Sequence, residues 1–206
     1  MSEAVEALGE AYEPLKVELS VAGSQVLVAQ VREGAPLDII VTADSATAAA
    51  LSGLGVVAGE AVAFARNRLA IAVPEGNPRG IRGLDDLAAS ELTLVLAAPA
   101  VPAGRYTAEL LDAAGLTLSP SSLEPSVRAV LSKVQLGEAD AGIVYRTDLN
   151  RPGVTGVEIP DAVNPIAEYF AAALTSASDP EEAASFVTFL GTPPAQQILA
   201  ELGFSS

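Results

Sequence analysis

The chain has 206 residues, half of them hydrophobic but only 4% aromatic, and its 26 acidic and 11 basic residues give a formal net charge of −15. This length can bury the core of one large domain or two small ones, and the negative charge makes nucleic acid and anionic membranes poor partners. Cysteine and histidine are both absent, which excludes a disulfide framework, a thiolate metal site and the commonest general base.

The predicted elements alternate between strands and helices along the whole chain. The stretch 17–44 has the clearest pattern, because Val17, Leu19 and Val21 alternate with polar residues before a helix and a second strand. Strands joined through helices pair in parallel, so an α/β fold with mostly parallel sheets is expected. In chain order the predictions are helix 4–12, strand 17–21, a helix from 24 to the break at 34–36, strand 38–44, helix 45–54, strands 61–65 and 69–73, helix 84–89, strand 92–98, helices 105–114 and 127–136, strand 141–145, extended segment 157–160, strand 166–174, and helices 180–190 and 193–202.

Four places share one geometry, in which a strand end or a loop leads into the start of a helix. They are Ser24, the loop 101–104, the turn 125–127 and Tyr145. Unpaired N–H groups and the helix dipole favour an anion there, and ligands of α/β sheets bind beyond the carboxyl ends of strands. A chain this acidic must hold an anion through several well-aimed N–H and O–H groups. Each place alone is weak evidence, and a simple helix cap is the alternative for Ser24.

Catalytic interpretations fit the sequence poorly. The segment around Ser24 does not match a nucleophile elbow, and the glycine-rich pieces match neither a P-loop nor a dinucleotide fingerprint. Asp38 and Asp44 could pair as carboxylates, although a turn and a helix cap explain them better. Three arginines flank the candidate sites and could touch an anion, although ion pairs with carboxylates are the expected role: Arg105, Arg128 and Arg146.

Several segments, in this order, resemble the molybdate-binding proteins of bacterial ABC transporters. Together they form a specific set, far stronger than any one of them. The segments are GS at 23–24, GAPLD at 34–38, TAD at 42–44, VPAGRY at 101–106, VR at 127–128, GEADAGIVY at 137–145, PAQQ at 194–197 and LGF at 202–204. The resemblance covers essentially the whole chain.

The resemblance implies a two-lobed periplasmic-binding-protein-like fold of type II, with helices on both faces of its sheets. Lobe I would comprise 1–67 plus 169–206, and lobe II 68–168, joined by two crossover strands that act as hinges. The lobes of this family close on a tetrahedral dianion. Carried over, the oxyanion ligands are the Ser24 hydroxyl and amide, the backbone N–H groups of Ala103 and Val127, and the Tyr145 hydroxyl.

The resemblance also implies a function: capture of molybdate or tungstate and delivery to the membrane subunits of an ABC permease. The protein would be a monomer outside the cytoplasm, without enzymatic activity or cofactor, and its metal would be bound only as the oxyanion. The alternatives are a binding protein for another oxyanion such as sulfate, and the effector-sensing domain of a transcription regulator. An enzyme is the third possibility.

One departure from the family concerns the start of the sequence. The family begins with a strand and a loop that carries another ligand serine, just before the helix that matches 4–12. Here Met1 and Ser2 align just past that serine, and Ser2 lies a position or two too late to replace it. No signal peptide is recognisable. We therefore expect weaker binding and lower stability than in a relative that has this strand.

Overall fold

The chain forms two structural units in the computed structural model, which describes residues 1–12, 17–89 and 91–205. Unit 1 comprises Met1–Arg66 and Glu168–Ser206, and unit 2 comprises Asn67–Ala167. The chain therefore passes between the units twice. That these units act as the moving lobes of a binding protein stays a prediction. None of the described helices is long and apolar enough to cross a membrane.

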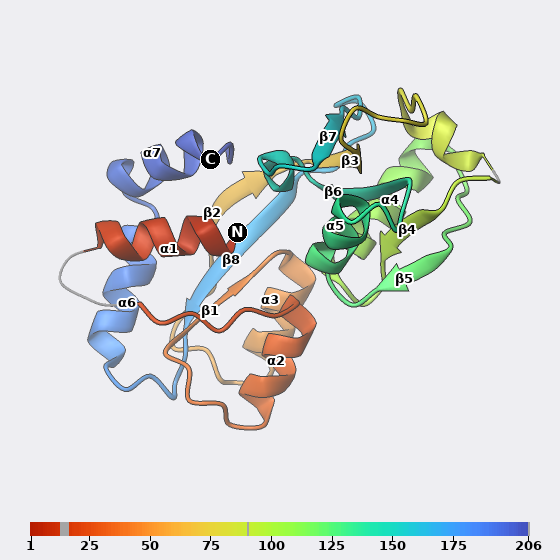
Figure 1. Cartoon of the computed structure of the whole chain (residues 1–206). Coiled ribbons are helices and arrows are strands. Elements are labelled where there is room, and N and C mark those ends of the chain that lie inside the picture. The colour runs from red at the N-terminus through yellow and green to blue at the C-terminus, as the bar shows by residue number, and fades with distance from the viewer. Residues whose placement is uncertain (13–16, 90, 206) are drawn as a thin grey trace. The chain divides into compact units, whose positions relative to one another are not determined.

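Unit 1 is built on a three-stranded sheet with the order β1-β8-β2, in which β1 runs antiparallel to β8 (Figure 1). Both faces of this sheet are covered. Residues of α1, α6 and α7 pack on one face with Tyr169 and Phe204, and residues of α2 and α3 pack on the other with Ile40. The elements are α1 Ser2–Ala11, α2 Ser24–Arg32, β1 Ile39–Thr42, α3 Ser45–Gly53, β2 Val62–Asn67, β8 Ala167–Ala173, α6 Pro180–Phe189 and α7 Pro193–Glu201.

The predicted strand over 17–21 is wrong. Residues 17–23 belong to no helix or strand, and the side chains of Leu19 and Val21 are 37% and 50% exposed. The alternation of apolar and polar residues is real, but a strand also needs a hydrogen-bonded neighbour. In unit 1 the edge strand β1 pairs only with β8 among the described strands. The extended segment 17–23 therefore leads into α2 without joining the sheet.

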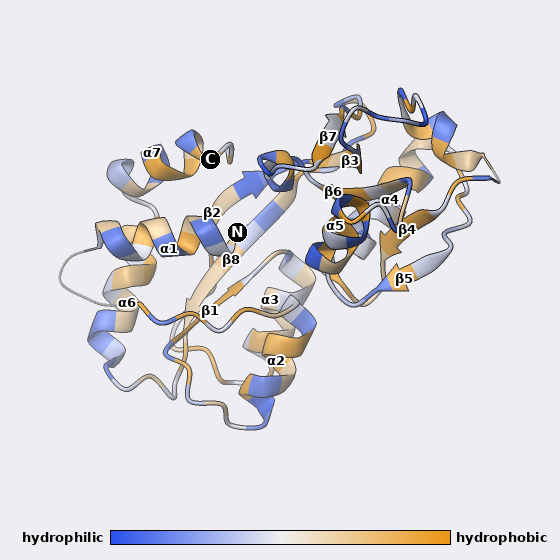
Figure 2. Cartoon of the chain, in the orientation of Figure 1, coloured by the Kyte–Doolittle hydropathy of each residue, from blue (hydrophilic) through white to orange (hydrophobic). Residues whose placement is uncertain are grey.

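Unit 2 is built on a five-stranded sheet with the order β5-β4-β6-β3-β7. Its central strands are almost wholly buried, and β4 is one of the most hydrophobic segments in Figure 2. The elements are β3 Leu69–Pro74, η1 Leu84–Ala88, β4 Leu94–Ala97, α4 Pro102–Ala114, β5 Ser122–Glu124, α5 Val127–Gln135, β6 Ala141–Tyr145, η2 Arg146–Leu149 and β7 Val154–Val157.

The expectation of mostly parallel sheets is also wrong, because both sheets are mixed or antiparallel. In unit 2, β4 is parallel to β5 and β6, whereas β3 is antiparallel to both β6 and β7. The reason lies in the connections. Strand β3 enters the unit 2 sheet directly from β2 of the other sheet, and its neighbours β6 and β7 are not the strands next to it in the sequence. The parallel rule applies to consecutive strands of one sheet joined by a crossover, so it does not govern these pairs.

An ion pair between a partly exposed lysine and a largely buried carboxylate ties β5 to α5. Lys133 Nζ lies 2.6 Å from Glu124 Oε1, which also accepts a hydrogen bond from Ser122 Oγ, and the Glu124 side chain is 9% exposed. The bond from Lys133, followed by that from Ser122, holds the pKa of Glu124 below its ordinary value. A lowered pKa means that this stabilisation is present above the unfolded-state pKa and is lost as the pH falls through the folded-state pKa.

We expect Lys133→Met to lower the free energy of unfolding by roughly 1–3 kcal/mol at pH 7, because it leaves a largely buried carboxylate uncompensated. The loss should shrink only as the pH falls through the lowered pKa of Glu124, because the unsubstituted protein keeps the ion pair until its own carboxyl is protonated. Urea denaturation at pH 7 and about pH 2.5 measures both values, and Glu124→Gln with Lys133→Met serves as the neutral control. An equal loss at both pH values would show that Lys133 stabilises through its aliphatic stem instead.

Candidate functional site

Three of the predicted site residues lie at one edge of the unit 2 sheet. Strands β4, β5 and β6 are parallel, so their carboxyl ends meet at the same edge. Ala103 and Val127 follow β4 and β5 along the chain, and Tyr145 is the last residue of β6. A hydrogen bond of 2.8 Å from the Ala98 N–H to the Glu124 carbonyl ties the loop after β4 to the end of β5.

Ala103 is the second residue of α4, which begins earlier than the sequence pattern predicts. The N–H groups of Gly104 and Arg105 bond back to the Val101 carbonyl, and Pro102 has no N–H. Helix geometry thus leaves the Ala103 N–H as the first amide of α4 without an intrahelical acceptor. Gly104 permits this arrangement, because a Cβ there would collide with the Ala98 carbonyl oxygen. The start of α4 is held tightly against the end of β4.

Val127 is the first residue of α5. The Ser126 side chain caps the helix by accepting a hydrogen bond of 3.2 Å from the Ala129 N–H. That cap serves the third amide of the helix and leaves the Val127 N–H, at the first position, free of an intrahelical role. The Val127 side chain is half-buried. The Val127 N–H thus lies at the first position of α5, where an amide can donate to an anion, and that it does so stays a prediction.

Tyr145 ends β6 with its side chain only 4% exposed. Its own N–H donates to Asp148 Oδ2 over 3.1 Å, which turns the chain into η2 directly after the strand. Burial and this bond together hold Tyr145 at the junction of β6 and η2. A phenolic hydroxyl held in this way can donate a hydrogen bond to an anion without carrying a charge.

Ser24 lies in unit 1, where it is the first residue of α2 and is 8% exposed. It does not cap its own helix, since Gly23 occupies the N-cap position and no side-chain cap bond is made. Instead Ser24 Oγ accepts a hydrogen bond of 3.2 Å from the Ala43 N–H, directly after β1. The simple helix-cap alternative for Ser24 is therefore wrong, and the hydroxyl proton remains available to an acceptor.

The other charged candidates have structural partners. Asp44 caps α3 through a bond of 2.8 Å from the Thr47 N–H, and Asp38 accepts bonds from the Ser178 N–H and hydroxyl. Arg146 pairs with Glu158 at 2.6 Å, and the Arg105 guanidinium donates to the Ala100 carbonyl. These contacts support the interpretation that the site uses neutral donors.

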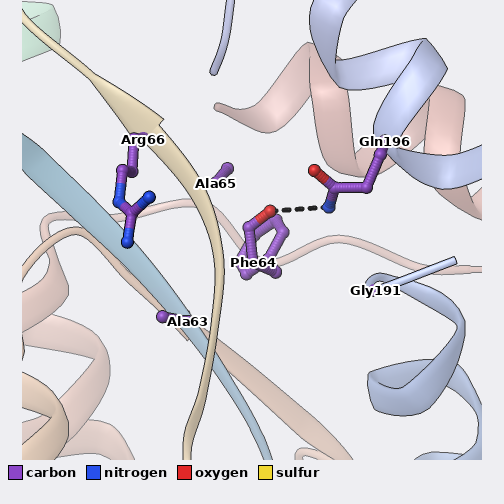
Figure 3. Close-up of a pocket in the computed structure, with 6 residues that line it drawn as sticks. All are labelled: Ala63, Phe64, Ala65, Arg66, Gly191 and Gln196. Carbon is purple, nitrogen blue, oxygen red and sulfur yellow. Dashed lines mark hydrogen bonds between the residues drawn. The ribbon is translucent and has the colours of Figure 1, made fainter. Parts of the chain in front are cut away.

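A surface pocket of unit 1 contains none of the predicted site residues (Figure 3). Its main polar contact is the Gln196 side-chain amide, which donates to the Phe64 carbonyl over 2.8 Å and to the Leu190 carbonyl over 2.7 Å. Those bonds cover the outer edge of β2 and join it to α7, so the pocket has a structural explanation. The lining residues are Ala63, Phe64, Ala65, Arg66, Gly191 and Gln196.

The sequence matches those of known proteins along most of its length. Residues 1–205 match the family model described as bacterial extracellular solute-binding protein. A molybdate-binding protein ModA from Mycobacterium tuberculosis is 37% identical over 193 residues, which cover 93% of this chain and 74% of that protein.

Two solved structures share the fold. The periplasmic molybdate-binding protein of Azotobacter vinelandii superposes with a TM-score of 0.85 at 20% identity, covering all of this chain and 95% of that one. The sulfate-binding protein SubI from Mycobacterium tuberculosis gives a TM-score of 0.84 at 20% identity, covering 98% of this chain and 81% of that one. At such identities the likeness shows the fold alone.

Proposed function

Since the chain belongs to the bacterial extracellular solute-binding proteins, and within them to the molybdate-binding proteins, we propose that it captures molybdate and delivers it to an ABC-type permease. The observation that carries this proposal is the set of neutral donors at one edge of the unit 2 sheet. Two helix starts and one buried tyrosine lie there, and no side-chain carboxylate is among the three donors. Such a donor set suits a dianion that must be recognised without a counter-charge.

We assign four residues to the oxyanion. Ser24 of unit 1 donates its hydroxyl and amide, Ala103 and Val127 of unit 2 donate their N–H groups, and Tyr145 donates its hydroxyl. A solute that binds donors of both units would favour the arrangement of the units in which all of these donors reach it. The reason is that a ligand stabilises the conformation for which it has the higher affinity. That arrangement is what the permease would recognise.

Sulfate is the second candidate, because it is also a tetrahedral dianion and the fold is shared with a sulfate-binding protein. Neutral N–H and O–H donors do not by themselves separate the two anions, which differ in size. Tungstate is closer to molybdate and stays a possible cargo. The monomeric state of the protein likewise stays a prediction.

The test is a thermal melt with molybdate, tungstate, sulfate or phosphate. A ligand that binds only the native state at a hundredfold excess over its Kd stabilises it by roughly 2.7 kcal/mol. At about 2–4 °C per kcal/mol for a chain of this size, we expect molybdate and tungstate to raise the melting temperature by several degrees and sulfate to leave it unchanged. A shift with sulfate alone would establish the second candidate.

Two side-chain variants test the site. Ser24→Ala and Tyr145→Phe each remove one hydroxyl, and a hydrogen bond to a charged group contributes about 1.5–3 kcal/mol. We expect each to raise the molybdate Kd by roughly tenfold or more, measured by calorimetric titration, with circular dichroism unchanged. Titration curves identical to those of the unsubstituted protein would remove that residue from the site.

A further inference from the structure

Thr42 is a buried hydroxyl that none of the contacts described so far explains. It is the last residue of β1 and is 2% exposed. Its Oγ1 has no hydrogen-bond partner among the described residues. A buried hydroxyl without a partner destabilises the fold, so one that persists calls for a reason. In the sequence, the visible signal for it is a polar residue at the end of the apolar run 39–41.

The position of Thr42 in β1 decides which way its side chain points. Side chains alternate along a strand, so Thr42 shares a face with Ile40. Ile40 packs with Val31 of α2 and Leu51 of α3, whereas the intervening Val41 packs on the opposite face of the sheet. The Thr42 hydroxyl therefore lies on the face covered by α2 and α3.

The start of α2 lies against this end of β1. Ser24 Oγ is 3.2 Å from the backbone N of Ala43, the residue after Thr42. One helix N-terminus, one serine hydroxyl and one unpartnered threonine hydroxyl thus gather at a single corner of unit 1. The nearby Asp44 carboxylate is held by the Thr47 N–H at the start of α3, where the helix dipole offsets its charge.

An anion at this corner would have to rely on neutral donors. Two arginines of unit 1 lie in described segments. Arg32 is in the last turn of α2, at the opposite end from Ser24, and Arg66 is paired with Glu168 at 3.1 Å. A dianion taken from water must recover its lost hydration through hydrogen bonds. A second hydroxyl beside Ser24 would therefore supply one of the neutral hydrogen bonds that a dianion bound there requires.

We propose that the Thr42 hydroxyl is a further ligand of the oxyanion, donating to it beside Ser24. This inference rests on the proposed function and adds a fifth residue to its site. The hydroxyl is kept unsatisfied in the free protein because its partner is the anion.

Thr42→Val tests the inference, because valine has the shape of threonine without the hydroxyl. We expect the melting temperature of the anion-free variant to equal or exceed that of the unsubstituted protein, since an unsatisfied group is removed. We expect the molybdate Kd to rise by roughly tenfold or more, the equivalent of one hydrogen bond to a charged group. Thr42→Ser, which keeps the hydroxyl, should retain most of the affinity.

Each alternative outcome overturns the inference in a recognisable way. A Thr42→Val variant that binds molybdate as tightly as the unsubstituted protein excludes the residue from the site. A lower melting temperature without anion shows that the hydroxyl has a structural role instead. If Thr42→Val fails to fold, Thr42→Ala must show the loss of affinity. If the unsubstituted protein itself binds no molybdate, tungstate or sulfate, the proposed function fails together with the inference.

Discussion

Val127→Pro is expected to leave the fold intact and to abolish most of the molybdate binding. Val127 is the first residue of α5, a position where proline is favoured because its fixed φ suits the helix and no intrahelical N–H is lost. Ser126, at φ −160 and ψ 157, already has the extended conformation that a following proline requires. The substitution removes the N–H of this residue, one of the backbone donors assigned to the anion, and places ring carbons where that hydrogen pointed.

The expected loss of affinity is at least about tenfold, since one bond to a charged group disappears and the ring also hinders the anion. Calorimetric titration with molybdate measures it, and a melt without anion should show a free energy of unfolding within about 1 kcal/mol of the original. Val127→Ala is the matched control, because it trims the side chain but keeps the N–H, and it should bind normally. Loss of binding in Val127→Ala as well would mean that the side chain, rather than the amide, matters.

Much of the fold follows from local pattern in the sequence. The strand 141–145 is confirmed residue for residue as β6, and the helix 180–190 is confirmed with Asp179 as its cap, because burial and capping are local properties. The short strand β5, in contrast, lies in a stretch that reads as a polar loop. Its residues Ser122 and Leu123 are paired with β4 although neither is fully buried, so tertiary pairing rather than hydrophobicity makes the strand.

The sequence predicts some of the residues of the candidate site but not how they are grouped in space. Helix starts and strand ends can be recognised from capping residues, glycines and prolines, so the sequence alone predicts three donor positions of unit 2. That they share one edge follows only from the parallel order of β4, β5 and β6. The acceptor role of Ser24 toward Ala43 could not be predicted, because it joins the start of α2 to the end of a strand nineteen residues away. That Thr42 lies beside Ser24 likewise follows only from this contact.

A β-strand added ahead of Met1 is expected to stabilise unit 1 strongly. Strand β1 ends the sheet order β1-β8-β2, so one of its edges has no strand neighbour among the described residues. The segment 17–21 has the alternation of a strand, with Leu19 and Val21 substantially exposed. We expect the new strand to pair with the free edge of β1 and to offer its other edge to this segment, which would form ladder hydrogen bonds and bury these side chains.

The design is a seven-residue extension of alternating apolar and polar residues followed by a small-residue loop. Cross-strand pairs contribute about 0.2–1 kcal/mol each, so the gain should reach several kcal/mol and raise the melting temperature by roughly 5–10 °C. Hydrogen exchange should show new protection of the amides in 17–21 and in β1. Molybdate affinity should rise as well, since Ser24 bonds to the residue after β1 and a more stable β1 would hold it more firmly.

The matched control carries proline at alternate positions of the same extension. Proline cannot donate to a ladder and is not tolerated in a central strand, so this control should change neither melting temperature nor exchange. An equal rise in both extended proteins would attribute the stabilisation to nonspecific apolar contact. Protection in β1 without protection in 17–21 would mean that the new strand pairs with β1 alone and leaves this segment outside the sheet. In that case the alternating apolar and polar residues of 17–21 would belong only to the segment that connects to α2. The hydrogen bond from the Ala43 N–H would then be the contact that positions Ser24.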